Sequence, residues 1–308
     1  MRALAVGLAI SVTTVHLASA QAWVGPAGTG SVSFAVQKID NTGHIGTDEV
    51  SLPIGKSTTA AIYVEGEYAF TDRLTMSLGL PYVFARYIGP DSPPGPDRPV
   101  DICRCWNGGF QDVSVTARFN ISNGTLGVTP FASFGVPSHD YDFRGEAVVG
   151  RALRELRLGV AAGRRLDPFA RRLSVVGSYS YAMVQKVVEV PNNRSNTDVG
   201  LGYAVSDALS LKGSLAWQRT HGGLRTIGPP PEPDGYPWGE ITNAELFSQH
   251  DRLLRDNSLH AAISASYSLR DVDLFGSYVV YVGGSNTHDG RAFTAGVSWP
   301  FAWSRPRK

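Results

Sequence analysis

The sequence predicts an all-β fold, a twelve-stranded antiparallel transmembrane β-barrel with short periplasmic turns and long extracellular loops. Apolar and polar residues alternate with a period of two over many segments, which is the pattern of strands with two different faces. Short links that carry Asp, Asn or Gly alternate along the chain with long links. After the first 20 positions, no apolar run is long enough for a membrane-spanning helix.

The composition excludes several classes of protein. Two cysteines among 308 residues are too few for a disulfide framework. The 28 Lys and Arg residues balance 27 Asp and Glu residues, so the chain has no basic excess that would indicate a nucleic-acid partner. Aromatic and β-branched residues recur throughout, which is not the composition of a disordered chain.

The N-terminus is expected to be an export signal. Arg2 supplies a basic start, residues 3–16 are mainly apolar, and Ala18-Ser19-Ala20 offers the small residues that a signal peptidase accepts. An uncleaved membrane anchor is the alternative, for which this apolar segment is short. We predict a signal peptide over residues 1–20, a barrel over residues 21–308 and a location in the bacterial outer membrane.

Twelve segments carry the alternating pattern. In the clearest, residues 258–269, apolar residues such as Leu259 and Ile263 occupy one face, and Ser258, His260 and Ser264 occupy the other. About ten residues in a tilted strand cross the apolar layer of an outer membrane. The expected strands are 31–38, 58–70, 73–87, 111–121, 125–136, 153–165, 171–186, 196–205, 208–219, 257–269, 272–283 and 291–301.

The links between these strands alternate in length. Short links are expected at 71–72, 122–124, 166–170, 206–207 and 270–271, and long links at 39–57, 88–110, 137–152, 187–195, 220–256 and 284–290. This alternation, with an even number of strands, places both chain ends on the periplasmic side. A soluble secreted β-sandwich, whose alternating face would bury a core, is the alternative fold.

Two predicted hairpins repeat one pattern. Residues 67–76 read EYAFTDRLTM and residues 202–211 read GYAVSDALSL, each with an aromatic residue, then a hydroxyl residue and Asp, then Leu. The hydroxyl and carboxylate side chains can bond the turn backbone. The first hairpin continues into Leu80-Pro81-Tyr82, and a glycine-rich approach at residues 108–111 leads to an Asp-led strand at Asp112.

This combination over residues 60–120 resembles the outer-membrane family named for the meta-pathway of phenol degradation, with looser agreement over most of the remaining chain. The resemblance implies an outer-membrane β-barrel that passes small, often aromatic or hydrophobic, compounds. The C-terminus also resembles the assembly signal of such barrels, because Thr294, Gly296, Trp299 and Phe301 fit its spacing. That implies the barrel assembly machinery as a partner, although Pro300 lies inside the signal and residues 302–308 extend beyond it.

No catalytic, metal or cofactor site is predicted. Cys103 and Cys105 lie in the second long loop, where a strained disulfide and inert thiols are alternatives. Ser285 and His288 are close in sequence, but a nucleophile needs its base within reach and a third group to orient it, so we favour a polar turn. No histidine stands at the spacing of a zinc site.

Charged residues on the polar face are expected to face the lumen, because an Arg or Lys at the lipid midplane costs about 2–4 kcal/mol. They form structural ion pairs or line a solute path. The long link 220–256, rich in proline, is expected to act as a lid over the mouth. The candidate lumen-lining residues are Glu65, Glu67, Asp112, Arg118, Glu155, Arg157, Lys212 and His260.

The function expected from these observations is passive passage of a small solute, with the outer-membrane bilayer and lipopolysaccharide as surroundings. An outer-membrane lipid hydrolase that uses Ser285 is one alternative. A structural or adhesive surface barrel that does not conduct is the other.

Overall fold

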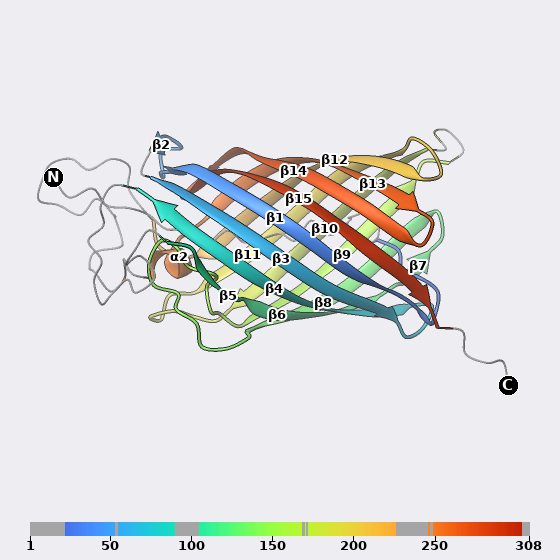
Figure 1. The fold of residues 1–308 in the computed structure, drawn as a ribbon, viewed down its shortest axis with the longest axis horizontal. Coiled ribbons are helices and arrows are strands. Elements are labelled where there is room, and N and C mark those ends of the chain that lie inside the picture. Colours follow the sequence, from blue (N-terminus) through green and yellow to red (C-terminus); the bar gives the residue numbers. More distant parts are fainter. Residues whose placement is uncertain are drawn as a thin grey trace, which may run out of the picture.

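The structure is a computed structural model in which one antiparallel sheet closes into a barrel (Figure 1). It describes residues 22–52, 55–89, 105–167, 172–225 and 249–303, together with residues 170 and 246. The predicted signal peptide lies outside the described residues. The sheet closes because β15 pairs with both β14 and β1. No helix in the described part of the chain is long and apolar enough to span a membrane.

The predicted twelve-stranded barrel is confirmed. β5 and β6 pair successively with β4 and together make one strand of the wall, whereas β2 (Ser51–Leu52) and β7 (Ser122–Asn123) are two-residue additions. The wall consists of β1 (Thr29–Ile45), β3 (Lys56–Ala69), β4 (Leu74–Ile88), β5 (Asn107–Phe110) with β6 (Asp112–Phe119), β8 (Leu126–Pro137), β9 (Glu155–Arg165), β10 (Leu173–Val184), β11 (Asn192–Ala204), β12 (Leu209–Gly222), β13 (Asn257–Leu269), β14 (Val272–Ser285) and β15 (Thr287–Ala302).

Side chains alternate in direction along each strand, which gives the barrel an apolar outside and a mostly polar inside. Leu78, Leu158 and Ile263 point outward with 54%, 48% and 67% of their surface exposed. Their neighbours on the same strands, such as Ser77 and Ala161, are buried on the inner side. A ring of outward aromatic residues lies near the short turns and includes Phe70, Phe119, Tyr203, Tyr267, Trp299 and Phe301. This is the arrangement of a barrel whose outside contacts hydrocarbon.

The links differ in part from the expectation. We call the end with the short turns the hairpin end and the opposite one the loop end (Figure 1). The predicted long link 284–290 is wrong, because only Asn286, with a left-handed φ of 52°, separates β14 from β15. β1 and β11 also extend into the predicted links 39–57 and 187–195. These extensions were missed because their outward residues, such as Asn193 and Ser195, are polar.

The repeated hairpin motif caps its turns through the hydroxyl residue. Thr71 Oγ1 accepts hydrogen bonds from the backbone N–H groups of Arg73 (3.1 Å) and Leu74 (2.9 Å). Ser206 Oγ accepts the equivalent bond from Leu209 at 3.0 Å. Asp72 does not bond its own turn here: its Oδ1 accepts a hydrogen bond from the backbone N–H of Ala27 at 2.8 Å. The motif therefore also anchors the segment that precedes β1.

Pro300 lies in β15 without the loss of a hydrogen bond between strands. The backbone N–H of Trp303 donates to Gly28 O. At this end of β15, the backbone N–H and C=O groups of odd-numbered residues therefore point to β1, and those of even-numbered residues point to β14. Pro300 lies beyond the last residue paired with β14, which is Ser298. The missing N–H of the proline therefore removes no ladder bond. Thr294 and Gly296 face inward on this strand, whereas Trp299 and Phe301 are exposed on the outside.

Candidate functional site

The candidate site is the lumen, and all eight predicted residues lie on the inward-facing positions of their strands. One pair joins β3 to β6 across β4, where Arg118 Nη2 contacts Glu67 Oε2 at 2.5 Å. Lys212 and His260 face inward from β12 and β13. Glu65 lies two residues from Glu67 on the same inner face of β3.

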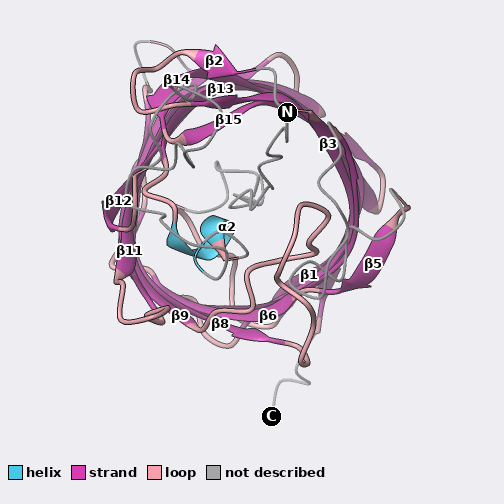
Figure 2. Ribbon diagram, turned by 90° about the vertical axis from the view of Figure 1, so that its left-hand side faces the viewer, coloured by secondary structure: helices cyan, strands magenta, loops and turns pink. Residues whose placement is uncertain are grey.

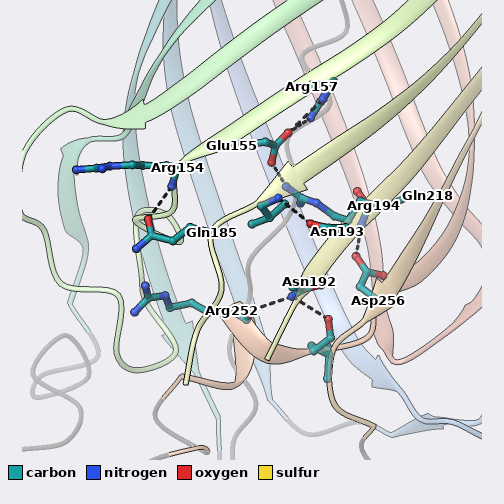
Figure 3. Close-up of polar contacts among 12 residues, drawn as sticks. Arg154, Glu155, Arg157, Gln185, Asn192, Asn193, Arg194, Gln218, Arg252 and Asp256 are labelled. Atoms are coloured by element: carbon teal, nitrogen blue, oxygen red, sulfur yellow. Dashed lines mark hydrogen bonds and ion pairs between the residues drawn. The ribbon is translucent and has the colours of Figure 1, made fainter. Parts of the chain in front are cut away.

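A second charged group lies nearer the loop end, where Glu155 stands between two arginines (Figure 3). Glu155 Oε1 accepts hydrogen bonds from Arg157 at 2.8 Å (Nη2) and 3.2 Å (Nε). Glu155 Oε2 pairs with the guanidinium of Arg194, whose side chain is 3% exposed. Arg194 lies in β11, two strands from Glu155, so the pair bridges over β10. Prediction from the sequence missed Arg194, because it fell in an expected loop.

The link between β8 and β9, residues 138–154, folds into the lumen. Tyr141 and Val149 pack against Ala61 of β3 and Val83 of β4. Tyr141 donates its hydroxyl to Asp112 Oδ1 at 2.5 Å and accepts the N–H of Ala152 at 2.9 Å. Burial raises the pKa of Tyr141, so its hydroxyl stays protonated and remains a donor. Asp112 therefore holds this loop in place.

The link between β12 and β13 also enters the barrel and carries α2 (His250–Leu253), which lies inside the ring of strands (Figure 2). Leu253 is fully buried against Leu153, Ala182, Val184 and Val187. Asn192 Nδ2 donates to Arg252 O at 2.7 Å. The predicted lid falls on this link, and most of it, residues 226–245, lies outside the described residues.

The two inward links meet each other at the loop end. The guanidinium carbon of Arg252 lies 3.7 Å from the ring centroid of Phe143, a cation–π contact that joins α2 to the β8–β9 link. His250, Asp251 and Arg252 are all buried. We call residues 138–154, 246 and 249–256 together the mouth plug. The mouth plug packs on the inner faces of β3, β4, β10 and β11 and so narrows the lumen at the loop end.

The mouth plug carries a titratable group at Asp256. Burial raises the pKa of this carboxyl to about 6, with Asp251 acting in the same direction and Arg151 in the opposite one. Because the folded-state pKa lies above that of the free carboxyl, the plug is most stable when Asp256 is protonated. It loses stability as the pH rises through about 6.

We therefore expect ion current through the reconstituted protein to be smaller at about pH 5 than at about pH 7.5. Asp256→Asn should remove most of this difference, because the amide oxygen can still accept the 2.8 Å hydrogen bond from Gln218. Asp142→Asn, at an exposed carboxylate of the same plug, is the matched control. The prediction is wrong if Asp256→Asn keeps the pH dependence of the unmodified protein.

At the hairpin end, residues 22–28 run along the inner rim of the barrel. Ala22 O accepts hydrogen bonds from Asn120 Nδ2 (3.2 Å) and Thr129 Oγ1 (3.0 Å). Trp23 Nε1 donates to Gly124 O at 2.9 Å. A Cβ atom built on Gly127 would lie 2.3 Å from Ala22 O, so this rim segment needs glycine on the adjoining wall.

Gly127→Leu is expected to displace residues 22–25 while the ladder around it stays intact. Amide hydrogen exchange of these residues should rise strongly, because the wall can no longer hold Ala22 O. Gly135→Leu is the control: Gly135 is on the same face of the same strand, and its Cβ would meet nothing within 4 Å. Equal exchange in the two variants would contradict the close packing seen here.

The remaining candidates have structural roles. Cys105 is disulfide-bonded, and Cys103 lies outside the described residues. Ser285 ends β14 directly before Asn286, His288 is the second residue of β15, and the ring of His288 packs edge-on against His44 with centroids 5.1 Å apart. This geometry supports the polar turn.

The fold is shared with a channel of known structure. The outer membrane channel COG4313 from Pseudomonas putida F1 matches with a TM-score of 0.65 and 13% identity, over 91% of this chain and 97% of that chain. The NanC porin has a TM-score of 0.48 and 10% identity, over 86% of this chain and 98% of that chain. No family model and no curated protein matches the chain. The chain thus has the fold of an outer-membrane channel, and membership of the meta-pathway family stays a prediction.

Proposed function

We propose that the protein is a channel of the bacterial outer membrane through which small aromatic or hydrophobic solutes pass without an energy source. The observation that carries the proposal is the closed barrel with an apolar outside and charged residues on its inner face, which has the fold of the COG4313 channel. In the proposed channel, the hairpin end faces the periplasm and the mouth plug faces the outside of the cell.

Apolar surface on the inner wall supports a solute with a hydrocarbon body. The ring of Phe131 lies over Gly159 and that of Phe275 lies over Gly296, because a Cβ atom added to either glycine would lie only 2.5 Å or 2.3 Å, respectively, from the ring. Both rings face the lumen from strands whose other inward residues are mostly small or polar. A path lined by flat rings and small residues suits a ring compound better than a strongly hydrated sugar.

Liposome swelling tests this proposal. The full chain is reconstituted and exposed to sugars, aromatic acids and apolar ring compounds of similar size. We expect faster entry of the ring compounds than of the sugars, relative to protein-free liposomes. If the folded, reconstituted protein gives no swelling and no ion current, the channel is refuted and a structural barrel is favoured.

A further inference from the structure

We propose that the lumen binds the carboxylate of a small organic anion at Lys212, Arg165 and Arg172, beside a glycine-lined hollow in the wall. This inference deepens the proposed function, on which it rests, by naming the charged group of the solute.

The site is a cavity of about 250 Å³ at the hairpin end of the lumen. That volume corresponds to roughly eight water molecules, enough for a single ring with one substituent. Four strands of the wall and the β9–β10 turn supply its polar lining. The polar groups include Arg165, Arg172, Lys212 and the hydroxyls of Ser174, Ser210, Ser264 and Ser266.

Two glycines of β11 shape the hollow. A Cβ on Gly200 would lie 2.5 Å from Lys212 Cε, so the lysine stem lies across the wall only because residue 200 has no side chain. A Cβ on Gly202 would lie 2.7 Å from Ser174 Oγ. Larger residues at these positions would lift Lys212 and fill the space beside it.

The charges in the cavity do not cancel. Asp198 is the carboxylate that interacts with Lys212, and it also accepts a hydrogen bond from Ser178 at 3.2 Å. Three cations and this one carboxylate leave two positive charges. Among the described residues that line the cavity, none is acidic.

The two arginines are held in position without losing charge. Arg172 Nη1 donates to Val205 O at 2.7 Å, and the guanidinium of Arg165 lies 5.2 Å from the centroid of the Trp23 ring. A backbone carbonyl and an aromatic face orient a cation but do not neutralise it. Both groups therefore remain able to attract an anion.

The opposite wall has the opposite sign. β3 and β11 are six wall strands apart in a ring of twelve, so Glu65 and Glu67 of β3 lie across the lumen from the hollow. Glu67 is paired with Arg118. The carboxylate of Glu65 on one side and the cations on the other orient a polar solute with its anionic group toward Lys212.

The hollow fits an organic anion better than an inorganic one. Val176, Gly202 and Ala204 line the same cavity and provide an apolar floor for a hydrocarbon ring. Guanidinium, ammonium and hydroxyl donors suit carboxylate oxygens, and the hydrogen bonds from the arginines and the lysine are stronger because both partners are charged. Benzoate combines the two features and is the probe for the test.

The experiment is calorimetric titration of the full, detergent-solubilised chain with benzoate, benzyl alcohol and inorganic phosphate. We expect benzoate to bind, and to bind about tenfold more weakly to Lys212→Met, since one charge-assisted contact is lost. Gly202→Val, which fills the hollow without changing charge, should also weaken binding. Lys38→Met, at a 60% exposed ammonium on the outer wall, should bind like the unmodified protein.

The other possible results would each contradict a part of the proposal. Equal binding of benzoate and benzyl alcohol, or no effect of Lys212→Met, overturns the site. Phosphate that binds as tightly as benzoate overturns the preference for an organic anion. If the protein conducts but benzoate neither binds nor blocks the current, the site fails while the channel stands. If benzoate binds but reconstituted protein passes no solute, the channel fails while the site stands.

Discussion

Leu253→Asp is expected to open the loop end of the barrel and to raise ion conductance several-fold. Leu253 is fully buried among Leu153, Ala182, Val184 and Val187. A carboxylate among these apolar side chains would lose its hydration, which costs several kcal/mol. We therefore expect α2 to leave the lumen while the strands stay paired.

Planar-bilayer recordings check the conductance, and heat-dependent mobility in gels checks that the barrel is folded. Val188→Asp is the matched control, since Val188 is 50% exposed in the neighbouring β10–β11 link and should tolerate the charge. Unchanged conductance of a folded Leu253→Asp protein would show that the mouth plug does not limit the current.

Glu155→Gln is expected to lower the free energy of unfolding by about 3 kcal/mol or more. The substitution removes the carboxylate that pairs with Arg157 and with the almost fully buried guanidinium of Arg194. Removal of one partner from a buried ion pair is costly because it leaves the other charge uncompensated. Denaturant unfolding of the barrel in lipid vesicles measures the loss.

The double substitution Glu155→Gln/Arg194→Gln should recover much of this stability, because it removes the stranded charge as well. Glu189→Gln is the control: the side chain of Glu189 is 95% exposed, 4.0 Å from Lys186, and its removal should cost almost nothing. A Glu155→Gln protein as stable as the unmodified one would mean that water reaches and screens this group.

Much of the wall could be predicted from the sequence. Strands such as β13 and β6 follow directly from alternation, since a face in hydrocarbon and a face in water impose a period of two on the residues. The short turns followed from local chemistry, as Thr71 and Ser206 show. The strand extensions beyond the membrane were missed, because both of their faces are polar and no period remains.

The barrel, its twelve strands and the charged side chains of its inner face could all be predicted from the residue pattern. The contacts that fill the interior could not, because they join strands and loops far apart in the chain. Examples are Glu155 with Arg194, Arg252 with Phe143, and Ala22 with Asn120. The period of a strand reports which side a residue faces, whereas its partner across the lumen depends on how the sheet closes and on which loops fold inward.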